Sequence, residues 1–208
     1  MKVNFFSQIS VVVSEQLIYA RLGYAKGKTQ LARAQKDEIK SYIAQAMSLI
    51  DLQGVEARIG IKNIGSADIA LDENIILKSA SLAKFLKGCS EVIFMAVTAG
   101  KPIVRAIENN SKGENVYAAV IFDAVASEIT DAGLGWIMQY INRQLRRQNR
   151  CVTSARFSAG YGDFSLENQR IIWQVLRLKE LGIDLTQSNM LVPEKSVTAV
   201  AGIKQILA

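Results

Sequence analysis

The longest helical pattern in the chain, from residue 114 to about residue 148, constrains the fold more than any other feature. Gly133 and Gly135 fall inside this pattern and are expected to bend the helix. Several small alanines in its first half would let the helix pack closely against a neighbouring element. The residues expected to share one face at helical spacing are Val116, Val120, Ala124 and Ser127.

Strand patterns occur on both sides of this helix in the sequence. The run EVIFMAV at 91–97 is continuously apolar and bounded by glycines, which is typical of a central strand. VEARIGIK at 55–62 alternates apolar and polar residues, which predicts a half-buried strand. Helices and strands interleave without a uniform βα repeat, so we expect an α+β fold with a mixed or antiparallel twisted sheet packed with helices. Further strands are expected at 11–13, 73–78, 153–158, 183–188 and 196–203, and further helices at 15–22, 31–51, 81–87, 102–109 and 166–178.

The helix expected at 31–51 has one apolar face, and the residues that step along it are Ile39, Ile43, Met47 and Ile50. Residues 24–30 between the first two helices are expected to form a loop. With 208 residues, of which 50% are hydrophobic, the chain can form one domain over 1–208, with a largely helical N-terminal part at about 1–53. A membrane-spanning helix needs about 20 apolar residues, and every apolar run here is shorter, so we expect a cytoplasmic protein.

The sequence contains no histidine, which excludes several kinds of site. Neither a Ser-His-Asp triad nor a Cys-His pair can form, and no imidazole can bind a metal. Cys89 and Cys151 are too few for a four-thiolate site and are expected to be reduced thiols. We therefore expect no metal site and no catalytic acid or base of the usual kind.

The formal net charge is +6, and part of it lies in the segment RQLRRQNR at 143–150. Four arginines at helical spacing are consistent with a solvated helix end, where cations interact favourably with the helix dipole. They are also consistent with a surface that docks an acidic partner. Nucleic acid is a third possibility, although no aromatic or glycine pattern of a nucleic-acid-binding module accompanies these residues.

The segment from Arg156 to Asp163, RFSAGYGD, is the most unusual local feature. An arginine can bind a carboxylate through two parallel hydrogen bonds. Gly160 and Gly162 would let the backbone approach a ligand closely, and Tyr161 offers a ring and a hydroxyl. A plain turn with a surface arginine would also fit. On the long helix, Glu128 and Asp131 are three residues apart and could contact one ligand, or both could be solvated.

The run RFSAGYGDFSLENQRIIWQVL at 156–176, followed by GIDLTQSNMLVPEKSVTAVAGI at 182–203, resembles the activation (reactivation) domain of cobalamin-dependent methionine synthase. The family pattern is RxxxGY, then a helix, then an LTxSxxMxPxxSVS-like segment. The segments RLGY at 21–24, LKGCSEVIFMAVTAG at 86–100 and FDAVASE at 122–128 resemble stand-alone members of that family. The resemblance covers most of the chain.

This resemblance implies a single S-adenosylmethionine-binding activation domain. Such a module presents the sulfonium methyl group to cobalamin held by a partner, a cobalamin-binding methyltransferase domain or subunit that serves methionine biosynthesis. A flavodoxin- or ferredoxin-type electron donor would reduce the inert Co(II) form, and methyl transfer would then restore methylcobalamin. The chain alone would lack complete catalytic machinery. The alternative is a scaffold of the same family that has lost ligand binding.

By the family pattern, Arg156 would hold the methionyl carboxylate, and the backbone near Ser158 and Gly160 would meet the adenine. Tyr161 would border the corrin side. An acidic residue on the long helix would hold the ammonium group. At the position of the family's usual glutamate this sequence has Ser127, with Glu128 next to it. The segment 190–192 could pack in the core or form an apolar rim facing the corrin.

Overall fold

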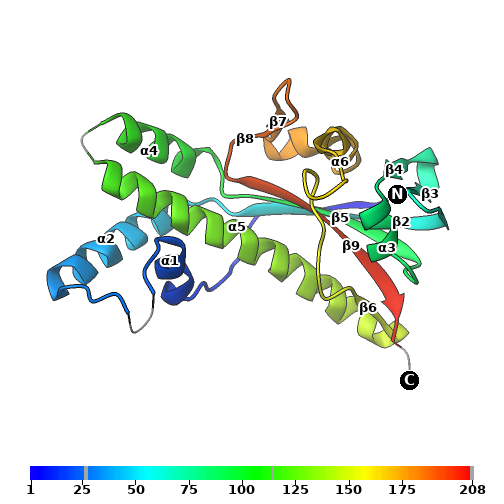
Figure 1. Cartoon of the computed structure of the whole chain (residues 1–208), viewed down its shortest axis with the longest axis horizontal. Coiled ribbons are helices and arrows are strands. Elements are labelled where there is room, and N and C mark those ends of the chain that lie inside the picture. The colour runs from blue at the N-terminus through cyan, green and yellow to red at the C-terminus, as the bar shows by residue number, and fades with distance from the viewer. Residues whose placement is uncertain (26–27, 114, 207–208) are drawn as a thin grey trace.

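The computed structural model describes residues 1–25, 28–113 and 115–206, and a seven-stranded antiparallel sheet forms the centre of this part (Figure 1). The α+β class expected from the sequence is confirmed, and the sheet is antiparallel. The strand order is β4-β3-β2-β5-β9-β6, and β1 pairs with the first half of β2. The strands are β1 (Val3–Phe6), β2 (Gln53–Ile64), β3 (Asp68–Leu71), β4 (Ile76–Lys78), β5 (Glu91–Thr98), β6 (Arg150–Val152) and β9 (Ser196–Gln205).

Strand β5 is central, as its unbroken apolar sequence predicts. It pairs with β2 on one side and β9 on the other, with Ala96 opposite both Val55 and Thr198. Phe94 and Met95 are fully buried although they point to opposite faces of the sheet. Both faces of β5 are therefore covered, which explains why its residues do not alternate in polarity.

Helices cover both faces of the sheet. The long helix α5 (Val116–Leu145) crosses one face together with α1 (Glu15–Arg21), α2 (Arg33–Leu49) and α4 (Lys101–Lys112) (Figure 1). The short helices α3 (Ala80–Phe85) and α6 (Gln169–Val175) cover the other face. Two apolar cores result, one on each side of the sheet.

Helix α5 crosses β5 at Gly133, where a Cβ atom would lie 2.8 Å from Val97 Cγ1. Helix α5 is continuous through both glycines. The short distance to β5 explains why a residue without a side chain is present at position 133. The start predicted at residue 114 lies outside the described residues. The helix ends at Leu145, and a 3₁₀ turn follows at Arg146–Gln148.

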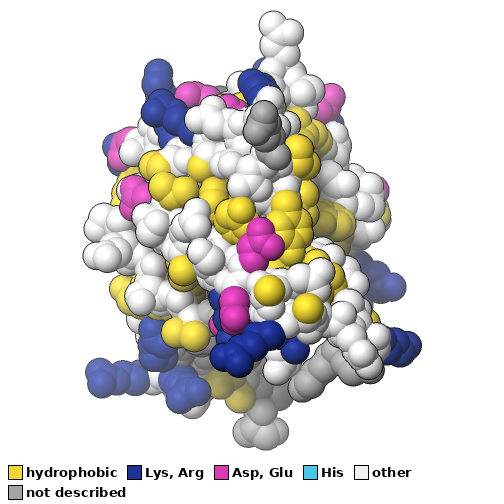
Figure 2. Space-filling model, turned by 90° about the vertical axis from the view of Figure 1, so that its left-hand side faces the viewer, with side chains coloured by type: hydrophobic (Ala, Val, Ile, Leu, Met, Phe, Trp, Pro, Cys, Tyr) yellow, Lys and Arg dark blue, Asp and Glu magenta, His cyan; other side chains and the backbone are white. Residues whose placement is uncertain are grey.

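The face predicted for the start of α5 was wrong in its first two positions. Val116 and Val120 are about half exposed, whereas Ala118 and Ala119 face the core. Figure 2 views the molecule from the end where α2 begins and α4 ends, and hydrophobic side chains gather at the middle of that surface. The smaller alanines are buried because α2 and α4 pack closely on α5.

Three further expectations need correction. The segment 11–13 is irregular, with Val12 98% exposed, and the first strand lies earlier, at β1. The segment 153–158 is not a strand, because only Phe157 forms an isolated bridge, to Val200. Helix α2 buries Ala46 and leaves Met47 exposed, one position away from the predicted face. The loop predicted at 24–30 includes residues 26–27, which lie outside the described part.

The N-terminal part contributes a strand as well as helices. Val3 pairs with Ala57, and the chain then returns to the sheet where the Ile9 amide donates to the Leu52 carbonyl at 2.9 Å. Among the described residues, no helix combines the length and apolar character needed to cross a membrane.

Candidate functional site

A hollow of about 1040 Å³ lies between the middle of α5, the segment 156–161, and the first residues of β9. A two-stranded hairpin, β7 (Asp184–Leu185) and β8 (Leu191–Val192), forms its remaining wall. We call it the ligand hollow. Its volume is at the upper end of the range for small-molecule sites.

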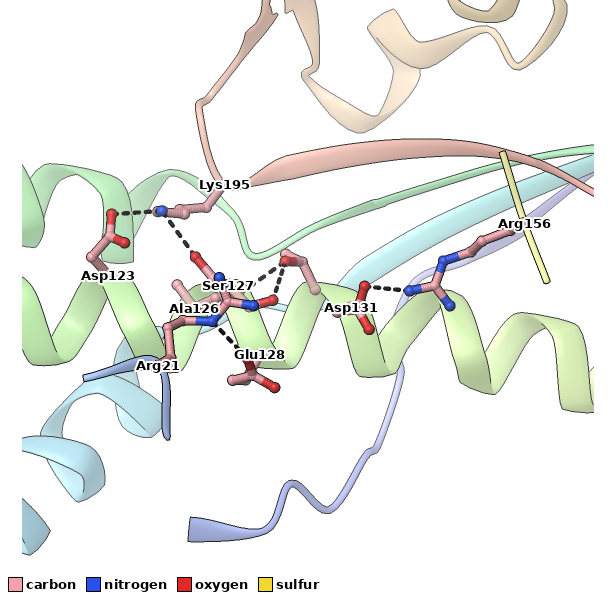
Figure 3. Close-up of polar contacts among 9 residues, drawn as sticks. Arg21, Asp123, Ala126, Ser127, Glu128, Asp131, Arg156 and Lys195 are labelled. Atoms are coloured by element: carbon pink, nitrogen blue, oxygen red, sulfur yellow. Dashed lines mark hydrogen bonds and ion pairs between the residues drawn. The ribbon is translucent and has the colours of Figure 1, made fainter. Parts of the chain in front are cut away.

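Arg156 lines the ligand hollow, and both its backbone and its guanidinium are held in place. The next residue, Phe157, exchanges two backbone hydrogen bonds with Val200 of β9, at 2.8 and 2.7 Å, which fixes the backbone. The guanidinium extends to α5, where Nη2 donates to Oδ1 of Asp131 (Figure 3). Asp131 also lines the hollow, and its side chain is 61% exposed. A cation and an anion therefore lie side by side at the hollow.

The RxxxGY element forms a tight turn, as its glycines predict. Gly160 has a φ of +93°, and its amide donates to the Phe164 carbonyl at 2.7 Å. Tyr161 lines the hollow with 69% of its surface exposed. The Ser158 hydroxyl donates to the Thr198 carbonyl at 2.9 Å, which attaches the segment to β9.

Asp163 anchors this turn to the start of α3. Its carboxylate accepts from the Ser79 hydroxyl at 2.7 Å and from the Ala80 amide at 2.6 Å. Hydrogen bonds from Ser79 and Ser81 lower the pKa of Asp163 from 3.8 to about 2. The turn that carries Tyr161 is therefore fixed to a helix on the far side of the sheet from α5.

Glu128 and Ser127 lie on α5 but are absent from the described lining of the hollow. Glu128 Oε1 accepts from Arg21 Nε of α1 at 2.6 Å (Figure 3). Ser127 Oγ accepts from Lys195 Nζ at 3.1 Å, and the same ammonium lies 2.6 Å from Asp123 Oδ1. The structure thus places Arg156, Ser158 and Tyr161 at the hollow, whereas Gly160 is in the same turn but absent from the described lining. Ser127 is connected to the hollow through Lys195.

Two charged residues of the hollow were not assigned a role from the sequence. Lys195 and Glu194 lie immediately before β9, inside a segment already noted for its family resemblance. With Arg156 and Asp131 they give the hollow two cations and two anions. A site with both signs of charge can bind a zwitterion such as an amino acid.

The β7–β8 hairpin gives the hollow an apolar rim. Met190 and Val192 are exposed, whereas Leu191 is half-buried against the core. The hairpin is attached to α6 through Arg170 Nε, which donates to Asn189 Oδ1 at 2.6 Å.

The described residues contain no cluster of three or more His, Cys, Asp or Glu side chains that could hold a metal ion. Cys89 and Cys151 are both free and half-buried, and burial raises the pKa of the Cys89 thiol.

Comparisons with known proteins support the fold through structure rather than sequence. No model of a protein family matches the chain, and no curated protein matches it. Among solved structures, the MetH reactivation domain bound to AdoHcy is similar to it, with a TM-score of 0.68 over 97% of this chain and 78% of that chain. The two sequences are 15% identical, so the similarity shows a shared fold.

Proposed function

We propose that this protein binds S-adenosylmethionine in the ligand hollow and presents its methyl group to a corrinoid held by a cobalamin-binding methyltransferase domain or subunit. The observation that carries this proposal is the Arg156–Asp131 pair at the hollow. The fold supports it, because a domain of this fold has been solved with AdoHcy, the demethylated product of that ligand.

The amino-acid end of the ligand would bind at the charged pair. Its carboxylate would accept two hydrogen bonds from Arg156, and its ammonium would donate to Asp131. Arg156 would then exchange the Asp131 carboxylate for the ligand carboxylate, and Asp131 would exchange the Arg156 guanidinium for the ligand ammonium. Because Asp131 is largely exposed, the pair is partly screened by water, and separating it costs little.

The adenosine end would lie along the turn. Ser158, Ala159 and Tyr161 line the hollow, and Gly160 forms the turn between them with a positive φ. Tyr161, Met190 and Val192 are exposed beside the same opening. These apolar surfaces would contact the flat face of a corrinoid presented by the partner.

The residues present suit a role in positioning rather than in acid–base catalysis. A sulfonium is a good leaving group and reduced cobalt is a strong nucleophile, so holding the methyl group at the right place supplies most of what the protein must contribute. A flavodoxin- or ferredoxin-type donor would provide the electron. The activity would serve reactivation of a methionine synthase.

Binding is tested first. Isothermal calorimetry with S-adenosylmethionine and with AdoHcy should give saturable heat, and Arg156→Ala should weaken binding by about 1.5–3 kcal/mol, or about 10- to 150-fold. Arg33→Ala is the matched control, because Arg33 is an exposed arginine on α2 whose only described ion pair is a 3.9 Å contact with Asp37. Absence of heat at millimolar ligand would overturn the proposal and leave the scaffold alternative.

Methyl transfer is tested second. The protein is mixed with cob(II)alamin, a one-electron reductant and S-adenosylmethionine labelled in its methyl group. The proposal expects label in the corrinoid that depends on the protein and on Arg156. Ligand binding without any such transfer would limit the function to binding.

A further inference from the structure

A second concave surface lies where the last turns of α5 meet β1 and β2. It consists of two hollows of about 270 and 420 Å³ that share Tyr140 and Gln144 as lining residues. We call the two together the basic groove. Its lining residues are Lys2, Asn4, Arg58, Tyr140, Arg143, Gln144 and Arg147.

Four cations line the basic groove, and within the described part of the chain no carboxylate does. The cations come from separate segments: Lys2 precedes β1, Arg58 lies on β2, Arg143 on α5 and Arg147 in the 3₁₀ turn. The helix dipole accounts for a cation in the last turn of α5 but not for those that β1 and β2 bring to the same place. Like charges brought together repel one another until an anion binds among them.

Arg58 is fixed from beneath the groove. Glu56 is fully buried and lies 3.4 Å from Arg58 Nε, and Asn4 Nδ2 donates to Glu56 Oε1 at 2.5 Å. Arg58 Nη2 donates to Gln144 Oε1 at 2.5 Å, which directs the guanidinium toward α5. The Glu56 carboxylate therefore orients a cation and is itself hidden from an incoming anion.

An aromatic cluster supports the groove. Tyr140 stacks on Trp136 with ring centroids 5.6 Å apart, and Phe6 of β1 packs edge-on against both rings. The Tyr140 ring is therefore held rigidly between the two hollows. Tyrosine and arginine are enriched at the centres of protein–protein interfaces, whereas lysine is depleted there, and the groove has three arginines and one lysine.

From this geometry we propose that the basic groove docks an acidic segment of a partner protein. Aspartate and glutamate side chains of the segment enter the two hollows on either side of Tyr140, and its backbone crosses the ring. Four cations around one short groove match such a segment better than a nucleic acid, whose phosphates require contacts along an extended strip. Arg143 lies roughly 18 Å further along α5 than Asp131, so docking leaves the ligand hollow open.

The test measures fluorescence anisotropy with a labelled oligoglutamate peptide of about ten residues at low salt. We expect saturable binding that is lost as salt rises toward about 0.5 M. The double variant Arg143→Ala/Arg147→Ala should weaken binding about tenfold or more. The control Arg33→Ala/Lys36→Ala removes the same charge from exposed positions on α2 and should change binding less than about twofold.

Both double variants should bind AdoHcy like the unmodified protein, so this result is independent of the ligand hollow. Equal losses in the two double variants would overturn the proposal, because they would indicate non-specific charge attraction. A single-stranded DNA of equal charge that binds more tightly than the peptide would overturn it in favour of nucleic acid. Tripolyphosphate binding as tightly as the peptide would overturn it in favour of a small-anion site.

Discussion

Arg156, on the segment that joins β6 to α6, donates to the carboxylate of Asp131 on α5, 25 residues earlier in the chain (Figure 3). In the proposed complex, Asp131 would meet the amino group of the ligand and Arg156 its carboxylate. The guanidinium is 26% exposed, so a ligand can reach it from the hollow. Binding of the amino group and of the carboxylate of a zwitterionic ligand can therefore be tested separately.

Asp131→Asn should weaken AdoHcy binding about tenfold, because the ligand ammonium loses a charged acceptor. An AdoHcy analogue that lacks the amino group should bind the variant at least as tightly as the unmodified protein, since Arg156 is released from its partner. Calorimetry measures both affinities. Glu128→Gln is the control three residues earlier on α5, where the carboxylate accepts from Arg21. A larger loss in Glu128→Gln than in Asp131→Asn would show that Glu128 holds the ammonium.

Asp163→Asn should lower the midpoint of thermal unfolding, because the carboxylate accepts hydrogen bonds from Ser79, Ala80 and Ser81. The pKa of about 2 in the folded state is below the value of 3.8 that sets the unfolded reference. Stabilisation by this group is therefore complete above about pH 4 and is lost as the pH falls toward 2. Unfolding midpoints of the two proteins, measured from about pH 6 to pH 2.5, should converge as the pH falls.

Asp184→Asn is the control for that experiment, since it changes the same charge at an exposed position on β7. It should leave the midpoint nearly unchanged at every pH. A gap between Asp163→Asn and the unmodified protein that stays constant down to pH 2.5 would contradict the assigned hydrogen bonds.

Arg58→Met should destabilise the fold by about 3 kcal/mol, because it leaves Glu56 buried without its cation. Adding Glu56→Gln to the same chain should recover part of that loss, since the unpaired charge is removed. Denaturant unfolding of the two single variants and the double variant forms a cycle that isolates the pair. If the double variant loses the sum of the two single losses, the residues do not interact.

The elements predicted correctly are those whose own residues carry a clear pattern. The run 91–97 identifies β5 because a strand covered on both faces has an unbroken apolar sequence. The turn around Gly160 was predicted because positive φ angles select glycine. By contrast, 153–158 reads as a strand, yet the only β-bridge described within it is that of Phe157 with Val200.

The charged partners could not be predicted in the same way. Arg21 and Glu128 are far apart in sequence, as are Lys195 and Asp123, so their pairing depends on how α1 and β9 pack on α5. Both Glu128 and Asp131 are on one helix turn, and the sequence does not show which one the hollow reaches. The family resemblance directed attention to position 127, whereas the sheet brings Arg156 to Asp131, one turn further along.

The two glycines of α5 should respond in opposite directions to the same substitution. Gly133→Ala places a methyl group 2.8 Å from Val97 Cγ1, so the Val97 side chain or the helix must shift, and we expect a loss of about 1–3 kcal/mol. At Gly135 a Cβ atom would meet no described atom within 4 Å, so Gly135→Ala should stabilise the helix by about 0.5–1 kcal/mol. Denaturant unfolding of both variants measures the difference. Stabilisation by both alanines would show that α5 does not approach β5 as closely as the structure places it.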